Sequence, residues 1–149
     1  MQFRTDINLD EAGDLVLHQM LGSAGEPLLD EYGNPYYDFN IAHDRQVVIQ
    51  GSMCRVRTQL SDWHTYPMLG ADLEKFIGEL NNPETAELII NSIRHAHTYD
   101  FFVKNDSLDI YAVPVNRNEV IFYIRLEYKH SEPIVFALPF NYNEGLGGQ

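Results

Sequence analysis

The sequence is poor in cysteine and in positive charge, and each shortage excludes a class of protein. Its 149 residues include one cysteine, Cys54, so no disulfide can form within the chain. Ten lysines and arginines stand against 22 acidic residues, which gives a formal net charge of −12. Binding to nucleic acid through phosphates requires a basic surplus, so we expect no nucleic-acid partner.

Long apolar runs are also missing. No run approaches the ~20 residues that span a membrane, and the N-terminus MQFRTDINLDEAGD lacks the apolar core of a secretory signal. We therefore expect a protein made in the cytoplasm, with no membrane partner. The chain is 44% hydrophobic, which is typical of a folded protein, and its length suits a single domain over residues 1–149.

The N-terminal part changes from strand-like to irregular sequence. Apolar residues that alternate on either side of DEAGD predict a β-hairpin over residues 3–17 that turns near Gly13. Residues 20–42 are rich in glycine and proline, and we expect a long irregular segment with no internal repeat. Its aromatic cluster either packs on its own domain or binds a partner or a small ligand, and comprises Tyr32, Tyr36, Tyr37 and Phe39.

Three helical segments are expected in the middle of the chain. They lie within residues 43–61, 70–78 and 80–98. The second is short and ends at a glycine, whereas the third has the favourable N-cap Asn82 followed by a proline at its first position. Apolar residues at helical spacing give the first and third segments a buried face: Ile49, Met53, Val56 and Leu60 in one, and Ala86, Ile89, Ile90, Ile93 and Ala96 in the other.

The C-terminal third predicts strands over residues 107–116, 119–128 and 133–140, followed by a flexible Gly-rich tail over 141–149. In the second strand one face is apolar and the other carries Arg125 and Glu127. The apolar face is formed by Val120, Phe122, Ile124, Leu126 and Tyr128. The expected fold is therefore α+β, with an N-terminal β-hairpin, about three helices and a mostly antiparallel C-terminal sheet.

Histidine and cysteine do not form a metal-binding pattern. His95 and His97 lie two positions apart and face different sides of a helix, and His64 lies near acidic residues without a defined ligand spacing. There is no HExxH motif and no cysteine pair. We predict neither a metal nor a cofactor, and we expect Cys54 to be a small core residue.

Catalytic motifs are equally scarce. There is no GxSxG nucleophile motif and no phosphate-binding glycine pattern. Asp72, Glu74 and Glu79 are candidates for acid catalysis only because carboxylates are plentiful. We therefore predict a non-enzymatic protein with no catalytic residues. The alternatives are a hydrolytic enzyme with Glu74 or Glu79 as its acid, and a small-ligand module that uses residues 32–39.

The loop over residues 61–70 contains the only tryptophan. We expect Trp63 and Tyr66 to cover the junction between two helices, and Pro67 and Gly70 to fix the turn. In this prediction Gly70 allows the next helix to start close by.

The order of these segments resembles the small wedge proteins of contractile phage tail baseplates, the GPW-like group. The similarity begins at DINLDEAGDLVL, residues 6–17, and continues through the helix at 43–61. It then covers YPMLGADLEKFIG, the helix NNPETAELIINSIRHAHT and the alternating β segment. Residues 20–42 lie outside it and resemble an insertion.

The resemblance implies a structural protein of the virion tail baseplate that binds other wedge proteins through its helical side and the tail sheath protein through its β side. It also implies six copies per tail. The family's usual Glu-Pro-Arg after the last helix is replaced here by Thr98, Tyr99 and Asp100, so the contact to other wedge subunits is expected at Tyr99 and Asp100. Some relatives carry a lysozyme label, which implies a peptidoglycan-degrading baseplate enzyme with Glu74 or Glu79 as its acid as the alternative, although this sequence offers no motif for it.

The last strand is the candidate for sheath attachment. Pro133 and Pro139 at the ends of PIVFALPF are typical of an edge strand, which can accept a partner strand by main-chain hydrogen bonds. One face of this strand is expected to lie on the helices and the other against solvent or a partner. Ile134, Phe136 and Leu138 share one of these faces, and Val135 and Ala137 share the other. The alternative is an internal strand that is paired on both sides within the chain.

Overall fold

The computed structural model describes residues 6–7, 17–39, 41–42, 45–127 and 132–146. The chain divides into two units, one of residues 2–50 and one of residues 51–149, and each is described by itself. The helix α1 (Arg45–Arg57) includes the division between them. The described residues have an α+β fold, as the sequence predicted.

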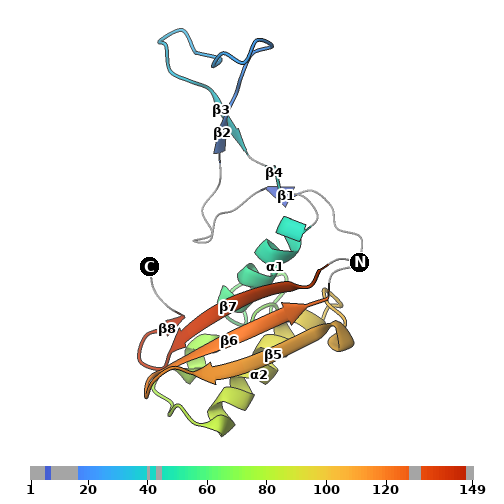
Figure 1. Ribbon diagram of the computed structural model, residues 1–149, viewed down its shortest axis with the longest axis vertical. Helices are drawn as coiled ribbons and strands as arrows, with labels where there is room; N and C mark the ends of the chain where they lie inside the picture. The colour runs from blue at the N-terminus through green and yellow to red at the C-terminus, as the bar shows by residue number, and fades with distance from the viewer. Residues whose placement is uncertain (1–5, 8–16, 40, 43–44, 128–131, 147–149) are drawn as a thin grey trace. The chain divides into compact units, whose positions relative to one another are not determined.

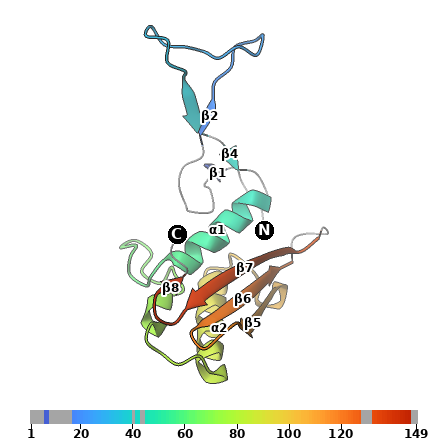
Figure 2. The ribbon, with the colours of Figure 1, turned by 60° about the vertical axis from the view of Figure 1, so that its left-hand side comes forward.

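The larger unit is built on a four-stranded antiparallel sheet in the order β5-β6-β7-β8. Its strands are β5 (Leu108–Pro114), β6 (Glu119–Leu126), β7 (Ile134–Asn141) and β8 (Gly145–Leu146). The helix α2 (Pro83–Thr98) covers one face of this sheet, as Figures 1 and 2 both show. Short 3₁₀ helices, η1 (Leu73–Phe76) and η2 (Asn105–Ser107), precede α2 and β5.

The prediction of about three helices is corrected, because the described residues contain two α-helices and the 70–78 segment forms only the 3₁₀ helix η1. Asp72 has a left-handed backbone with φ 54°, and Ile77 is extended, so four residues remain between them. A segment that short cannot sustain an α-helix. α1 also ends earlier than predicted, at Arg57. The amide of Ala71, in the loop that follows, donates a hydrogen bond to the carbonyl of Arg55.

α2 forms where the sequence predicted it. The side chain of Asn82 accepts a hydrogen bond from the Thr85 amide at 2.7 Å, so the predicted N-cap is confirmed. The predicted buried stripe is confirmed for Ile89, Ile93 and Ala96. Ala86 and Ile90 are half-buried, and Thr85 and His97 complete the buried face.

The core lies between α2 and the inner face of the sheet. Strand register aligns Leu126 of β6 with Leu108 of β5 and Ile134 of β7, and this pattern repeats along the strands. The predicted apolar face of β6 is confirmed at four positions, all buried: Val120, Phe122, Ile124 and Leu126. Tyr128 lies outside the described residues. On the opposite face Arg125 pairs with Asp109, with Nη1 and Oδ2 2.8 Å apart.

β7 differs from the predicted edge strand at its C-terminal end. It runs to Asn141, so Pro139 lies inside the strand, and β8 pairs with its last two residues. The tail predicted to be flexible from residue 141 therefore continues the sheet as far as Leu146. Tyr142 within it is buried and packs edge-on against Phe140, with ring centroids 5.3 Å apart.

In the smaller unit the predicted hairpin over residues 3–17 is wrong in its pairing. β1 (Asp6–Ile7) pairs with β4 (Ile41–Ala42), and β2 (Leu17–Gln19) pairs with β3 (Tyr37–Phe39). Alternation identifies a strand but not its partner. Here both N-terminal strands pair with strands at the end of the segment over residues 20–42, which was expected to be irregular. The turn expected near Gly13 lies outside the described residues.

Residues 20–36 form two successive turns that we call the double turn. The first is closed by a bridge between Leu21 and Pro27, and the second by a bridge between Leu29 and Pro35. The two share the pattern Leu-x-x-x-Gly-x-Pro at an interval of eight residues. The expectation of no internal repeat is therefore corrected, and this spacing was the signal that the sequence offered.

Candidate interaction surfaces

The first candidate surface is the open edge of β7. β6 pairs with all eight residues of β7, whereas β8 pairs only with Phe140 and Asn141. Among the described residues, the stretch Ile134–Pro139 therefore has no strand on its second side. The predicted alternation of its side chains is confirmed, because Ile134 and Leu138 are buried, Phe136 is half-buried, and Val135 and Ala137 are exposed.

Two observations identify which backbone amides of β7 face this open edge. The amide of Tyr142 donates to the carbonyl of Asn118, on the β6 side, at 2.8 Å. Pro139 has no N–H, and proline within a sheet is found where no ladder bond is required of it. Because successive amides of a strand point to opposite sides, Phe136 faces β6 while Val135 and Ala137 present their N–H groups to the open edge.

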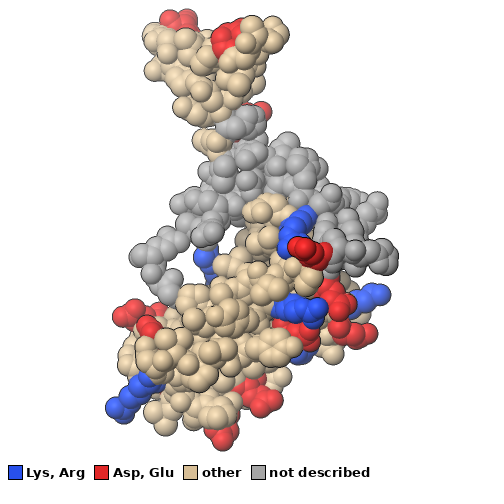
Figure 3. Space-filling view, viewed as in Figure 1, with Lys and Arg blue, Asp and Glu red and all other residues tan. Residues whose placement is uncertain are grey.

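The outer face of the sheet is a second surface. The Asp109–Arg125 pair lies at one end, and the rest is largely apolar. Figure 3, which has the viewpoint of Figure 1, shows few charged side chains over the middle of the sheet and more at its margin. The large exposed apolar side chains of this face are Tyr111, Val113, Tyr123 and Val135. A partner strand added to β7 would extend this face.

The loop after α1 is held by backbone hydrogen bonds rather than by its aromatic residues. The amide of Ala71 lies 3.0 Å from the carbonyl of Arg55 and 3.1 Å from that of Thr58. Gly70, with φ 127°, lies so close to the backbone of Thr58 that a Cβ atom there would overlap the Thr58 carbonyl. Pro67 helps to close the loop, since its carbonyl accepts from the Ser61 amide at 2.8 Å.

The covering role predicted for Trp63 and Tyr66 is contradicted. Trp63 is 57% exposed and Tyr66 is 62% exposed, and the neighbouring Met68 is exposed as well. The prediction required both side chains to be buried against the junction between two helices. The backbone hydrogen bonds make that unnecessary, so these side chains form a third exposed apolar surface.

The end of α2 is attached to α1 by an arginine clamp. The guanidinium of Arg55 bonds both carboxylate oxygens of Asp100, at 3.0 and 2.7 Å, and also the carbonyl of Ala96 at 2.9 Å. Its carbon lies 4.2 Å from the centre of the Phe102 ring. Gly51 of α1 permits this packing, because a Cβ atom there would lie 2.9 Å from the same ring.

Replacing Asp100 by asparagine is expected to destabilise the protein by about 2 kcal/mol. The Arg55 side chain is 13% exposed and that of Asp100 is 34% exposed, so the pair lies between a surface pair and a buried one. Chemical denaturation measures the change. Asp109→Asn is the matched control, because it breaks a more exposed pair and is expected to cost less than about 1 kcal/mol. Equal effects of the two variants would contradict a structural role for the clamp.

The predicted partner residues Tyr99 and Asp100 both have partners within the chain. Asp100 is held by Arg55, and the half-buried Tyr99 stacks on His95 with ring centroids 5.5 Å apart. The exposed residue here is Phe101, which is 87% exposed and has a left-handed backbone with φ 62°. A non-glycine residue in that conformation is uncommon and is often functional. Phe101 was not among the predicted partner residues, because no local pattern in the sequence distinguishes it.

His97 is a histidine of α2 whose pKa is strongly lowered. It is fully buried, its Nδ1 lies 2.7 Å from the carbonyl of Ile93, and its Nε2 has no partner there. Burial, with a smaller contribution from the nearby charge of Arg55, lowers the pKa of His97 from 6.5 to about 4, while the Ile93 hydrogen bond and the charge of Asp100 oppose this shift. His95, two positions away, is exposed, as the helical spacing predicted.

Acidification is expected to destabilise the fold through His97. The unfolded chain takes up a proton below pH 6.5 and the folded chain only near pH 4, so stability is complete above about 6.5 and falls as the pH decreases between these values. Between pH 7.5 and 5 the loss is about 2 kcal/mol. Urea denaturation at both pH values measures it. His97→Leu should remove this dependence, whereas the exposed-site control His64→Leu should retain it. A dependence that persists in His97→Leu would contradict the assignment.

The carboxylates considered for acid catalysis do not gather at one site. Glu74 and Glu79 are exposed, and neither lines the one cavity described below. Asp72 pairs with Lys75, with 3.4 Å between Nζ and Oδ2. Cys54 is exposed, which corrects its expected core position. Within the described part of the chain no three His, Cys, Asp or Glu side chains could together hold a metal ion.

Comparison with family models, curated proteins and solved structures finds no match to this chain. Within the described residues no helix has the length and apolar character that crossing a membrane requires.

Proposed function

We propose that this protein is a structural, non-enzymatic subunit of the inner baseplate of a contractile phage tail. It anchors the tail sheath, whose subunit adds a strand to the open edge of β7. The observation that carries the proposal is this edge, where Val135 and Ala137 present amides with no strand opposite them among the described residues. The order of segments that resembles the GPW-like wedge proteins supplies the identity of the partner.

Strand addition suits such a subunit because main-chain hydrogen bonds depend little on side-chain identity. The protein can then present to the sheath an edge like that of one more sheath subunit. An open edge is also an aggregation hazard. The net charge of −12 reduces edge-to-edge aggregation through β7 before assembly, because the copies repel one another.

The contact with other wedge proteins is proposed at the end of α2. Phe101 is the anchor, because a large exposed aromatic side chain is the residue type that dominates interface energetics. The Arg55–Asp100 clamp holds the residue that precedes Phe101 and so fixes the position of Phe101. In this proposal an apolar contact through Phe101 replaces the contact that the family makes through Glu-Pro-Arg. Six copies of the protein surround the tail tube.

The experiment compares phage tails made with and without this protein. We expect the tail lacking it to contain a tube with no attached sheath, and antibodies to the protein to label the baseplate end of the complete tail. A sheathed tail in its absence would contradict the proposal. Clearing of a peptidoglycan suspension by the purified protein, abolished in Glu74→Gln or Glu79→Gln, would instead support the enzymatic alternative.

A further inference from the structure

The double turn is held by hydrogen bonds and has little apolar interior of its own. Asp30 organises its second half, since one carboxylate oxygen accepts from the amides of Tyr32 and Asn34, both at 2.8 Å. These bonds lower the pKa of Asp30, with the Asn34 backbone as the largest contribution. The amide of Met20 donates to Tyr36 at 2.9 Å, and that of Leu28 donates to Met20 at 3.0 Å.

The apolar side chains of the double turn point outward. Tyr32 is 80% exposed, and the leucines and the second tyrosine are exposed as well: Leu21, Leu28, Leu29 and Tyr36. Residues 17–42 also contain four carboxylates, Glu26, Asp30, Glu31 and Asp38, and no lysine or arginine. The segment therefore presents apolar anchors surrounded by negative charge, which fits an apolar cavity that lacks acidic groups.

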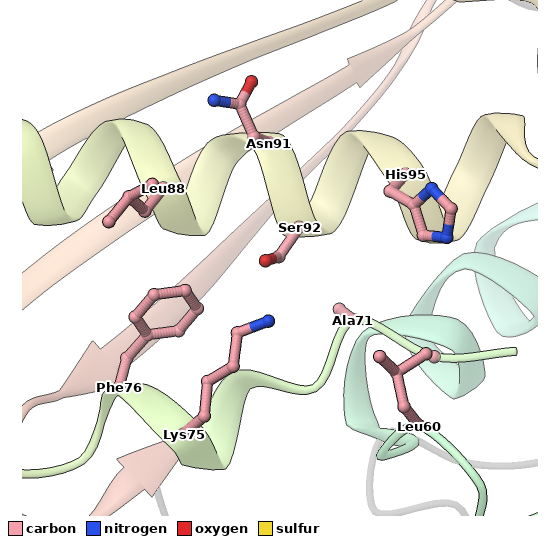
Figure 4. Close-up of a pocket in the computed structure, with 9 residues that line it drawn as sticks. Leu60, Ala71, Lys75, Phe76, Leu88, Asn91, Ser92 and His95 are labelled. Carbon is pink, nitrogen blue, oxygen red and sulfur yellow. The ribbon is translucent and has the colours of Figure 1, made fainter. Parts of the chain in front are cut away.

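The larger unit contains a cavity of that kind. It has a volume of about 430 Å³ and lies between η1 and the side of α2 that carries Leu88, Ser92 and His95. These residues are spaced i, i+4 and i+7 and so share one helix face. Figure 4 shows them opposite Phe76 and Lys75, with the lysine amine pointing towards Ser92.

The charge of this cavity is unusual for the chain. Its nine lining residues include one lysine and one histidine but no carboxylate, although acidic residues outnumber basic ones by 22 to 10 overall. Lys75 forms a partly exposed ion pair with Asp72, which contributes little, and its amine lies 5.1 Å from the centre of the Phe76 ring. Leu88 is 58% exposed at the cavity, so an apolar side chain there remains to be covered.

We propose that the double turn of one copy docks in this cavity of a second copy. Leu29 and Tyr32 would enter beside Leu88 and Phe76, and Glu31 would lie near Lys75. Because the two surfaces differ, the contact is heterologous and links copies head to tail, which closes into a ring or continues as a chain. This self-association is separate from sheath attachment and does not depend on it.

The test uses two full-length variants that each retain one of the two surfaces. The double-turn variant is Leu29→Ser with Tyr32→Ser, and the cavity variant is Leu88→Asp. All three positions are exposed, so the fold should survive, and circular dichroism checks this. Val113→Asp, at an exposed position on the outer face of the sheet, is the control. Light scattering coupled to size-exclusion chromatography gives the mass of each protein and of the mixture.

We expect the wild-type mass to rise with concentration, and each variant alone to associate at least tenfold more weakly. An equimolar mixture of the two variants should form a one-to-one dimer. The cavity variant keeps an intact double turn, which can dock in the intact cavity of the double-turn variant. The control should behave as wild type. A wild-type chain that stays monomeric, a mixture that stays monomeric, or association unchanged in both variants would each overturn the proposal.

Discussion

Gly70→Ala is expected to destabilise the protein by at least about 3 kcal/mol, the range of a severe single substitution. A Cβ atom at this position would overlap the Thr58 carbonyl oxygen, which is backbone and cannot rotate away. That oxygen accepts hydrogen bonds from Ala71 and Asp72, at 3.1 and 3.3 Å, so moving it would break the connection between α1 and η1. The φ of 127° adds strain for any residue with a side chain.

Gly78→Ala is the matched control for this prediction. Its φ is 92°, so alanine is strained there too, but a Cβ atom would meet nothing within 4 Å. We expect a cost of about 1–2 kcal/mol from the backbone alone. Thermal and urea denaturation of both variants separates strain from overlap. Equal losses of stability at the two positions would show that the contact with Thr58 does not matter.

Ala137→Pro is expected to abolish sheath attachment while the protein remains folded. The substitution removes one of the two N–H groups that face the open edge of β7, and the exposed side chain at 137 has room for a proline ring. Tails assembled with this variant should carry a bare tube. Electron microscopy of the tails and circular dichroism of the purified protein measure the two outcomes.

Two variants complete this experiment. Phe136→Pro removes an amide that faces β6, so it should destabilise the fold itself by about 3 kcal/mol or more. Ala137→Val changes the side chain but keeps the N–H group, and its tails should carry sheath normally. Normal sheath on a folded Ala137→Pro baseplate would rule out strand addition at this edge.

Local sequence patterns predicted much of the fold. The Asn82 cap and the stripe through Ile89 and Ile93 indicated α2, and alternation assigned the faces of β6 and β7. These features depend on neighbours within a few residues. The prediction of a helix at residues 70–78 failed, because the left-handed backbone of Asp72 limits the segment to the four residues of η1. That conformation depends on tertiary contacts around Gly70, which local patterns do not show.

The candidate surfaces were predicted less well, since they depend on residues far apart in sequence. The Arg55–Asp100 clamp joins positions separated by 45 residues, and it uses a carboxylate that the sequence assigned to a partner. The exposure of Phe101 and of Trp63 follows from backbone geometry that composition does not reveal. For β7 the prolines indicated an open edge. The Gly-rich sequence of the tail did not predict that β8 pairs with the last two residues of β7.

The most direct test of sheath anchoring is amide hydrogen exchange along β7, resolved by residue, with and without the sheath protein encoded in the same genome. In the isolated protein Val135 and Ala137 should exchange quickly, while Phe136 and Leu138, bonded to β6, should already be protected. Adding sheath protein should slow Val135 and Ala137 selectively and leave the edge strand β5 unchanged. Sheath binding that leaves these two amides exchanging as before would contradict strand addition to β7.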